Sequence, residues 1–366
     1  MKKRTRLLIY LSLLILILVI ASAWFLKNNP EQQPSKSASG MTDSSAEVAI
    51  DQTFDKIITT SHFKGTALLI KQGQIFYQQS YGYADAEKKQ DNQLDTLFPI
   101  ASLQKIITGA IIVDLLKDKK LKITDTLDEF YPEIDLSDTI TIQQLLTHTS
   151  GIMMDEIEPA EVLTNQSDQL DFTLENLTTS RNKDFFYTNA NYTLLAGIIS
   201  QIIGQNYEEI VQKKIIDPLS LKRTYFWDIL PKKERTPNSY YYLDNDYEID
   251  PFQPNKQLFS SLLGAGNMYM SVTDFWTFIQ SLTNGKLFSK ETYEQFAEVH
   301  KEGYQAGIFY FDDLKYSEGS LGGFNTVIYG DQDNQNLVIL FANQSPNESL
   351  QELSQSLYNQ IVLQND

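Results

Sequence analysis

The chain has 366 residues, long enough for one large domain or two ordinary ones, and 42% of them are apolar. Its net charge of −17 excludes most nucleic-acid-binding proteins, which need a basic surface to bind phosphates. The absence of cysteine excludes disulfides, thiolate zinc sites and a cysteine nucleophile, and the three widely separated histidines exclude a helical His-x-x-x-His metal site.

Residues 1–27 predict a membrane anchor. A basic tip is followed by an uncharged run of twenty residues, Leu7 to Leu26, which as a helix would span roughly 30 Å, the thickness of a bilayer core. Positive charge before the run predicts a cytoplasmic N-terminus with the rest of the chain outside. The segment Ala21-Ser22-Ala23 is similar to a signal-peptidase site, so a cleaved signal peptide is the alternative. The apolar run continues past this segment, which favours an uncleaved single-pass anchor.

Residues 28–48 predict a flexible linker, because they contain two prolines and a serine-rich run and show no periodicity. Residues 1–27 carry five basic and no acidic side chains, which leaves a net charge of −22 on residues 28–366. The folded domain expected at 49–366 is therefore strongly acidic.

Hydrophobic patterns in this domain predict an α+β fold. Apolar runs at 65–70 and 74–81, separated by Lys71-Gln72-Gly73, predict a β-hairpin. The middle of the domain, about 120–220, is mostly helical by pattern. Further strands are predicted at 306–311, 324–329 and 337–342, and the final helix would place four residues on one face: Leu350, Leu353, Leu357 and Ile361. Strands at both ends predict one antiparallel sheet flanked by helices, with a mostly helical subdomain.

The sequence Ser-x-x-Lys places a hydroxyl and an amine on one face of a helix, where a desolvated lysine can act as a general base. The pattern occurs three times, at Ser61/Lys64, Ser102/Lys105 and Ser180/Lys183. Only Ser102 begins a strongly apolar helix, predicted at 102–119, and the alternative role for it is a simple N-cap. Ser102 is therefore the candidate nucleophile and Lys105 the candidate base.

The sequence Tyr187-Thr188-Asn189 offers a phenol as an acid or base and an amide to position the lysine and the substrate. It occurs once and directly precedes an apolar run. Taken alone, it is also compatible with a surface turn.

Together these motifs resemble the serine β-lactamase and penicillin-binding protein superfamily, in its class C β-lactamase-like branch. The resemblance covers most of residues 50–345 and includes ordered segments at 98–105, 142–151, 186–189, 217–219 and 264–268. It implies a β-lactamase/transpeptidase-like fold, with Ser102 acylated, Lys105 as its base partner, and Tyr187 and Asn189 as the second motif. It implies no metal or other cofactor. His148 lies in a segment that is structural in this family, and no Gly-x-Ser-x-Gly elbow accompanies it.

The third motif of the family, normally Lys or His, then Thr or Ser, then Gly, is degenerate in this chain. Its best match is Ser317-Glu318-Gly319-Ser320, where a carboxylate appears and the cation is missing. The Ser320 N–H is expected to join that of Ser102 in an oxyanion hole. Repulsion from Glu318 would disfavour a substrate carboxylate, unless this side chain points into solvent from an alternating strand.

A D-alanyl ester on teichoic acid fits these residues, because its carboxyl group is the scissile ester and its ammonium would favour Glu318. Some wall-associated members of the resembled family are such esterases. We therefore expect a bacterial, membrane-anchored serine hydrolase acting outside the cell on D-alanyl groups of the envelope. The alternatives are a D-Ala-D-Ala carboxypeptidase or penicillin-binding protein acting on peptidoglycan peptides, and a non-catalytic wall-binding or sensory domain.

Overall fold

A computed structural model describes residues 44–231, 233–234 and 236–363. The anchor expected at 1–27 and residues 28–43 of the expected linker lie outside this range. Helix α2, Ser44–Thr60, starts within the last residues of that linker. Within the described ranges, no helix combines the length and apolarity needed to cross a membrane.

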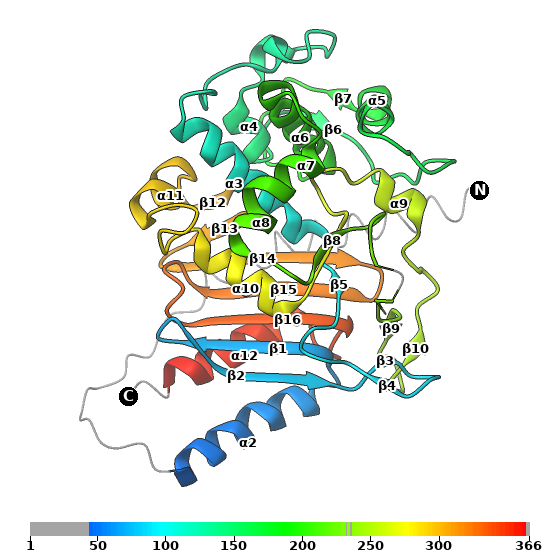
Figure 1. Ribbon diagram of the computed structural model, residues 1–366, viewed down its shortest axis with the longest axis vertical. Coiled ribbons are helices and arrows are strands. Elements are labelled where there is room, and N and C mark those ends of the chain that lie inside the picture. Colours follow the sequence, from blue (N-terminus) through cyan, green and yellow to red (C-terminus); the bar gives the residue numbers. More distant parts are fainter. Residues whose placement is uncertain (1–43, 232, 235, 364–366) are drawn as a thin grey trace. The chain divides into compact units, whose positions relative to one another are not determined.

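The fold is α+β and is built on one nine-stranded sheet (Figure 1). The order along its main path is β10-β9-β16-β15-β14-β13-β12, and β1 pairs with both β16 and β2. Every pairing is antiparallel except the short one between β9 and β16. The strands are β1 Lys64–Lys71, β2 Gln74–Tyr81, β9 Tyr240–Tyr241, β10 Glu248–Ile249, β12 Gly303–Gln305, β13 Ile308–Phe311, β14 Leu314–Leu321, β15 Phe324–Asp331 and β16 Leu337–Gln344.

Alternate residues of the central strands pack into two different cores, as the two-residue period of a strand requires. Leu68 and Ile339 face the larger core, which contains the helical middle of the chain. Leu69 and Leu340 face a second core beneath α2 and α12, Leu350–Leu363. Both faces of the sheet are therefore covered, and the residues predicted on one face of the last helix are all buried in the second core.

The helical layer surrounds α3, Gln104–Lys117, which is buried over nearly its whole length. Helix α3 packs against α6, which in turn contacts α4, α5 and α7 (Figure 1). The remaining helices are α4 Ile142–Leu146, α5 Gln166–Asn176, α6 Asn189–Ile203, α7 Tyr207–Val211, α8 Asp217–Leu219, α9 Lys256–Ser260, α10 Val272–Ser281 and α11 Lys290–Phe296, with a π-helical turn at Gln212–Ile216 and short 3₁₀ turns at Leu127–Glu129 and Ser137–Thr139.

Three small sheets complete the fold. One consists of β5 Phe98–Pro99, β11 Met268–Met270 and β8 Thr224–Phe226, in the order β5-β11-β8. The others pair β3 Tyr83–Asp85 with β4 Gln90–Asp91, and β6 Ile152–Met153 with β7 Thr178–Thr179. The pairing of β5 with β11 fixes the chain that enters α3, so this sheet positions the first residues of the predicted site.

The predicted hairpin is confirmed, with Gln72 and Gly73 at positive φ angles of 52° and 72°, as a tight two-residue turn requires. The antiparallel sheet formed from the two ends of the domain is also confirmed, because β1 pairs with β16. The predicted central helix is shorter than expected. A 3₁₀ turn, η1 Ala101–Leu103, precedes it, and α3 ends at Lys117.

Candidate active site

Ser102 lies in the 3₁₀ turn η1, between strand β5 and helix α3. The preceding residue, Ala101, has a φ angle of 45°, an uncommon conformation for a residue with a side chain. The N-cap of α3 is Leu103, and neither η1 nor α3 has a side-chain cap. Ser102 therefore does not serve as an N-cap, which was the alternative role, and its partly exposed hydroxyl is available for other contacts.

The Lys105 side chain is fully buried and ends beside Ser102. Its Nζ lies 3.1 Å from Ser102 Oγ, 2.8 Å from Asn189 Oδ1 and 2.9 Å from the Ala265 carbonyl oxygen. Burial lowers the pKa of Lys105 to about 7, and the negative charge of Glu156 acts in the opposite direction. A substantial fraction of this amine is therefore neutral near neutral pH.

The three contacts of Lys105 can be made by the protonated amine, as three donated hydrogen bonds, and also by the neutral amine. A neutral amine has two N–H donors and one lone pair. Asn189 Oδ1 and the Ala265 carbonyl oxygen can only accept, so in the neutral form they take the two N–H bonds and the lone pair is left toward Ser102 Oγ. In this arrangement the serine O–H can donate to the lysine nitrogen, which is the geometry needed for proton removal.

Helix α6 places the second motif next to this pair. Thr188 caps the helix by accepting a hydrogen bond from the Ala190 N–H, and the first helical residue is Asn189. The Tyr187 ring lies with its centroid 4.9 Å from Lys105 Nζ. Burial raises the pKa of Tyr187 above its ordinary range, against an opposing interaction with Ser102. Tyr187 therefore stays a protonated phenol at neutral pH and can donate a proton.

Strand β14 forms another wall of the site. Strand β13 pairs with β14 only up to Tyr316. Residues 317–321 of β14 therefore have no β13 partner, and β14 contacts η1 there. A Cβ atom at Gly319 would lie 2.3 Å from the Ile100 carbonyl oxygen and 3.0 Å from the Ser102 nitrogen. Glycine is thus required for β14 to approach the nucleophile this closely.

Glu318 and Ser320 alternate with Gly319 and are exposed. The Glu318 carboxylate accepts a hydrogen bond from the Tyr316 hydroxyl, and its charge contributes to the raised pKa of Tyr187. The surrounding protein raises the pKa of Glu318 itself, even though solvent reaches the residue. The structure thus brings Ser102, Lys105, Tyr187, Asn189 and Gly319 together, with Glu318 and Ser320 on the adjoining strand positions.

Two contributors were not identified from the sequence. The first is the loop at 264–267, whose Ala265 carbonyl binds Lys105. Gln104 fixes this loop by donating to Asn267 Oδ1 and accepting from the Asn267 N–H. The second is Glu156, whose Oε2 lies 3.2 Å from Asn189 Nδ2. The ordered match at 264–268 pointed to the loop, whereas no spacing or motif pointed to Glu156.

His148 is fully buried. Its Nδ1 accepts a hydrogen bond from the Thr188 N–H and lies 3.0 Å from Asn191 Nδ2, so the second ring nitrogen carries the proton. Its ring centroid lies 4.4 Å from that of Tyr187. Burial and, to a smaller extent, the charge of Lys105 lower its pKa well below the usual range. His148 supports Tyr187 as a neutral packing residue, which agrees with the structural role expected for it.

The two other Ser-x-x-Lys pairs make separate contacts. Lys64 forms an ion pair with Asp246 at 2.9 Å, while the Ser61 hydroxyl donates to the carbonyl of Ile58. Lys183 donates to the Ser150 carbonyl, 2.7 Å away, and the Ser180 hydroxyl accepts from the Asn182 N–H. Of the three pairs, Ser102/Lys105 is the one in which serine and lysine bind each other.

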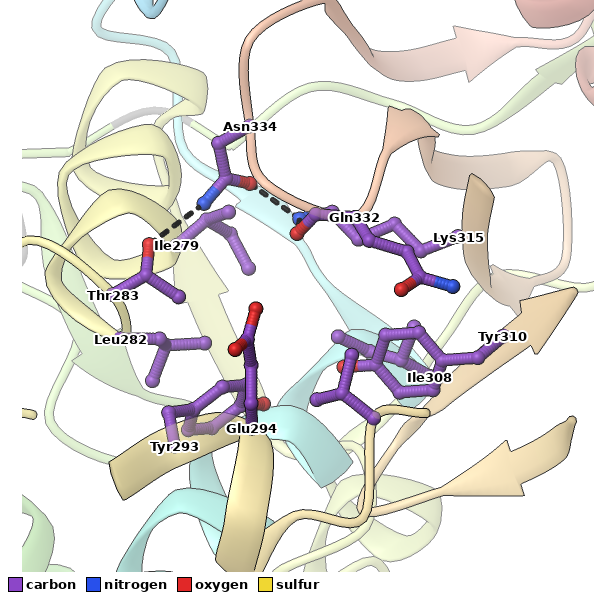
Figure 2. Close-up of a pocket in the computed structure, with 11 residues that line it drawn as sticks. Ile279, Leu282, Thr283, Tyr293, Glu294, Ile308, Tyr310, Lys315, Gln332 and Asn334 are labelled. Carbon is purple, nitrogen blue, oxygen red and sulfur yellow. Dashed lines mark hydrogen bonds between the residues drawn. The ribbon is translucent and has the colours of Figure 1, made fainter. Parts of the chain in front are cut away.

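A buried lysine with a low pKa is not by itself a catalytic base. Burial also lowers the pKa of Lys315, on β14, to about 7. Lys315 belongs to a separate small cavity between β13, β14, α10 and α11 (Figure 2), where it donates to Asn334 Oδ1 and to the Gln332 carbonyl. The cavity has room for about one water molecule. Lys105 differs because a serine hydroxyl is its third partner.

Comparisons with known proteins agree with this geometry. A family model named Beta-lactamase matches residues 50–358. A protein of Bacillus subtilis (strain 168) named as a penicillin-binding protein, PbpX, is 29% identical and covers 94% of this chain and 92% of its own length. The teichoic acid D-alanine hydrolase of Staphylococcus aureus is also 29% identical, over 85% of this chain and 77% of that protein. The crystal structure of FmtA from Staphylococcus aureus superposes with a TM-score of 0.77 at 24% identity, covering 94% of this chain and 95% of that one.

Proposed function

This chain belongs to the beta-lactamase family, and we propose that it is the kind of serine hydrolase that releases D-alanine from D-alanyl esters of teichoic or lipoteichoic acid. The observation that carries the proposal is the hydrogen-bonded group of Ser102, Lys105 and Asn189 beside the strand edge at 317–320, which carries no lysine or histidine to bind the carboxylate of a peptide substrate. The similarity to a teichoic acid D-alanine hydrolase supports the same substrate.

In the first half-reaction, Ser102 Oγ attacks the ester carbonyl carbon while its proton passes to the neutral amine of Lys105. The Ser102 and Ser320 N–H groups are proposed to stabilise the developing oxyanion. The carbon–oxygen bond to the polymer then breaks, the departing polymer oxygen takes the proton of the Tyr187 hydroxyl, and Lys105 returns a proton to Tyr187. The products are the free polymer hydroxyl and a D-alanyl ester on Ser102.

In the second half-reaction, water attacks the same carbonyl carbon. Its proton passes to the Lys105 and Tyr187 pair, the bond between the carbonyl carbon and Ser102 Oγ breaks, and Oγ recovers a proton. The products are D-alanine and the free serine. One water is consumed for each ester hydrolysed.

The proposal is tested by incubating the protein with D-alanylated lipoteichoic acid and, separately, with a peptide ending in D-Ala-D-Ala. We expect free D-alanine from the first substrate, and a mass increase on Ser102 equal to one alanyl residue in quenched samples. Release from the peptide alone would favour the carboxypeptidase alternative, with which the similarity to PbpX is compatible. Release from neither substrate would contradict both.

We also propose that residues 1–27 anchor the enzyme as a single-pass protein in the bacterial cell membrane, with residues 49–366 outside. The basic tip and the uncharged run from Leu7 to Leu26 support this placement. In the same assay on fractionated cells, the D-alanine-releasing activity should therefore sediment with the membranes.

The rate should depend on pH through Lys105. Below its pKa of about 7 the lysine is an ammonium and cannot accept the serine proton, so kcat/KM should rise with pH through a midpoint near 7. Tyr187 stays protonated across this window, because burial raises its pKa. The profile should be measured on an uncharged ester so that the substrate itself does not titrate. A midpoint near that of an ordinary lysine, about 10.4, would rule out Lys105 as the base.

A further inference from the structure

Glu156 lies at the end of a chain of contacts that begins at the nucleophile. Ser102 Oγ contacts Lys105 Nζ, this Nζ donates to Asn189 Oδ1, and Asn189 Nδ2 donates to Glu156 Oε2 at 3.2 Å. Glu156 follows β6 in a segment without regular structure, and solvent reaches it. The Glu156 carboxylate is thus linked to the reacting hydroxyl through Lys105 and through the same Asn189 amide that holds this base.

The negative charge of Glu156 is not balanced by an ion pair. Among residues 44–363, apart from 232 and 235, no lysine, arginine or histidine lies within ion-pair distance of its carboxylate. The negative charge of Glu156 raises the pKa of Lys105, so the two groups interact. The Lys105 amine is nevertheless partly neutral near pH 7 and does not balance this charge. Desolvation by the surrounding protein raises the pKa of Glu156, while the charge of Lys105 and the hydrogen bond from Asn189 act in the opposite direction.

Glu318 is the other carboxylate near the site, and its placement is less suited to contact the reacting group. Gly319 is the residue of β14 that faces Ser102, and the side chain of its neighbour Glu318 therefore points to the opposite side of the strand. Its carboxylate also already accepts a hydrogen bond from Tyr316. Glu318 affects Tyr187, whereas Glu156 affects both Tyr187 and Lys105.

We propose that Glu156, held by Asn189, binds the α-ammonium group of the acyl part of the substrate and so makes the enzyme selective for aminoacyl esters. This inference rests on the proposed function. In an aminoacyl ester the ammonium is attached to the carbon next to the scissile carbonyl, so it must lie close to Ser102 when the carbonyl is attacked. Asn189 contacts Lys105 through Oδ1 and Glu156 through Nδ2, and so holds the Glu156 carboxylate in that region as the acceptor.

The neutral state of Lys105 in the active enzyme also favours binding of an ammonium group at Glu156. An ammonium substrate would be repelled by a protonated lysine next to Ser102, but the active form of Lys105 is neutral. Glu156 then faces one positive charge, that of the substrate, and a charge-assisted hydrogen bond between them is about twice as strong as a neutral one. An ester without an α-ammonium group cannot form this hydrogen bond, so Glu156 would not increase its rate of hydrolysis.

The test compares two esters of glycerol, the D-alanyl ester and the isobutyryl ester, in which a methyl group replaces the ammonium. For Glu156→Gln, the ratio of kcat/KM for the D-alanyl ester to that for the isobutyryl ester should fall roughly 10- to 100-fold below the wild-type ratio, the worth of one hydrogen bond to a charged group. The comparison of ratios between variants cancels the different intrinsic reactivities of the two esters. Removing the charge should also move the rising limb of the pH profile to lower pH, because Glu156 raises the pKa of Lys105.

Glu158→Gln is the matched control, because Glu158 is an exposed glutamate two residues away in the same segment, and it should keep the wild-type ratio. Equal losses on both esters in Glu156→Gln would mean that Glu156 only positions Asn189, and would overturn the inference. A collapse of the ratio in Glu318→Gln instead would assign the selectivity to Glu318 and would also overturn it. If the wild-type protein hydrolyses neither ester, the proposed function itself fails.

Discussion

Replacing Ser102 by alanine should lower the rate of D-alanine release by about 10⁴-fold or more, the scale seen when a serine hydrolase loses its nucleophile. The loss is large because, in the part of the chain that the structure describes, no other hydroxyl is hydrogen-bonded to Lys105. The alanyl adduct seen by mass spectrometry should disappear with it. The measurement is single-turnover release from D-alanylated lipoteichoic acid.

The fold should tolerate this change. Without Oγ, the neutral amine of Lys105 still donates to Asn189 and to the Ala265 carbonyl, so the free energy of unfolding should change by less than about 1 kcal/mol. Ser180→Ala is the matched control, since it removes the serine of another Ser-x-x-Lys pair that makes no contact with its lysine. Full activity of Ser102→Ala would mean that a different residue carries the acyl group.

Replacing Lys105 by methionine should lower the acylation rate by about 10³- to 10⁴-fold, near the upper end of what a general base contributes. Methionine fills a similar volume but cannot accept the serine proton. The rise of kcat/KM with a midpoint near pH 7 should vanish with the amine that produces it. The double variant Ser102→Ala, Lys105→Met should be no slower than Ser102→Ala alone, because the two side chains act as a unit.

This variant should also be less stable. Asn189 Oδ1 and the Ala265 carbonyl both lose their donor, and an unpaired buried acceptor costs about 1–3 kcal/mol. Thermal melting separates this loss from the kinetic one. Lys183→Met, at the partly exposed lysine of the matched motif, should change neither activity nor the pH midpoint. A Lys105→Met protein that melts normally but acylates at the wild-type rate would contradict the assigned role.

The parts of the fold that could be predicted from sequence are those whose pattern is local. The turn at Gln72-Gly73 marks its own hairpin, and the spacing of Leu350, Leu353, Leu357 and Ile361 marks a helical face. The Ser102 and Lys105 pair could be chosen from three candidates because the surrounding helix is apolar, and apolar surroundings are also what lowers the lysine pKa.

The parts that could not be predicted depend on contacts between distant segments. Glu156 reaches Asn189 only because the segment after β6 folds over the start of α6, and an acidic residue in an irregular segment has no distinctive spacing. The Ala265 contact uses a backbone carbonyl, which every residue has, so side-chain identity cannot reveal it. The need for glycine at 319 likewise becomes visible only when β14 is placed against Ser102.

The pairing of β1 with β16 sets the order in which the domain can fold during synthesis. Leu68 pairs with Ile339, so a strand made early must wait for one made almost at the end of the chain. Until β16 leaves the ribosome, β1 and β2 form only an isolated hairpin, which is marginally stable in water. Such non-local pairing makes folding slow, since loop closure precedes the contacts that compensate for it. The central sheet can therefore be completed only after β16 has been synthesised.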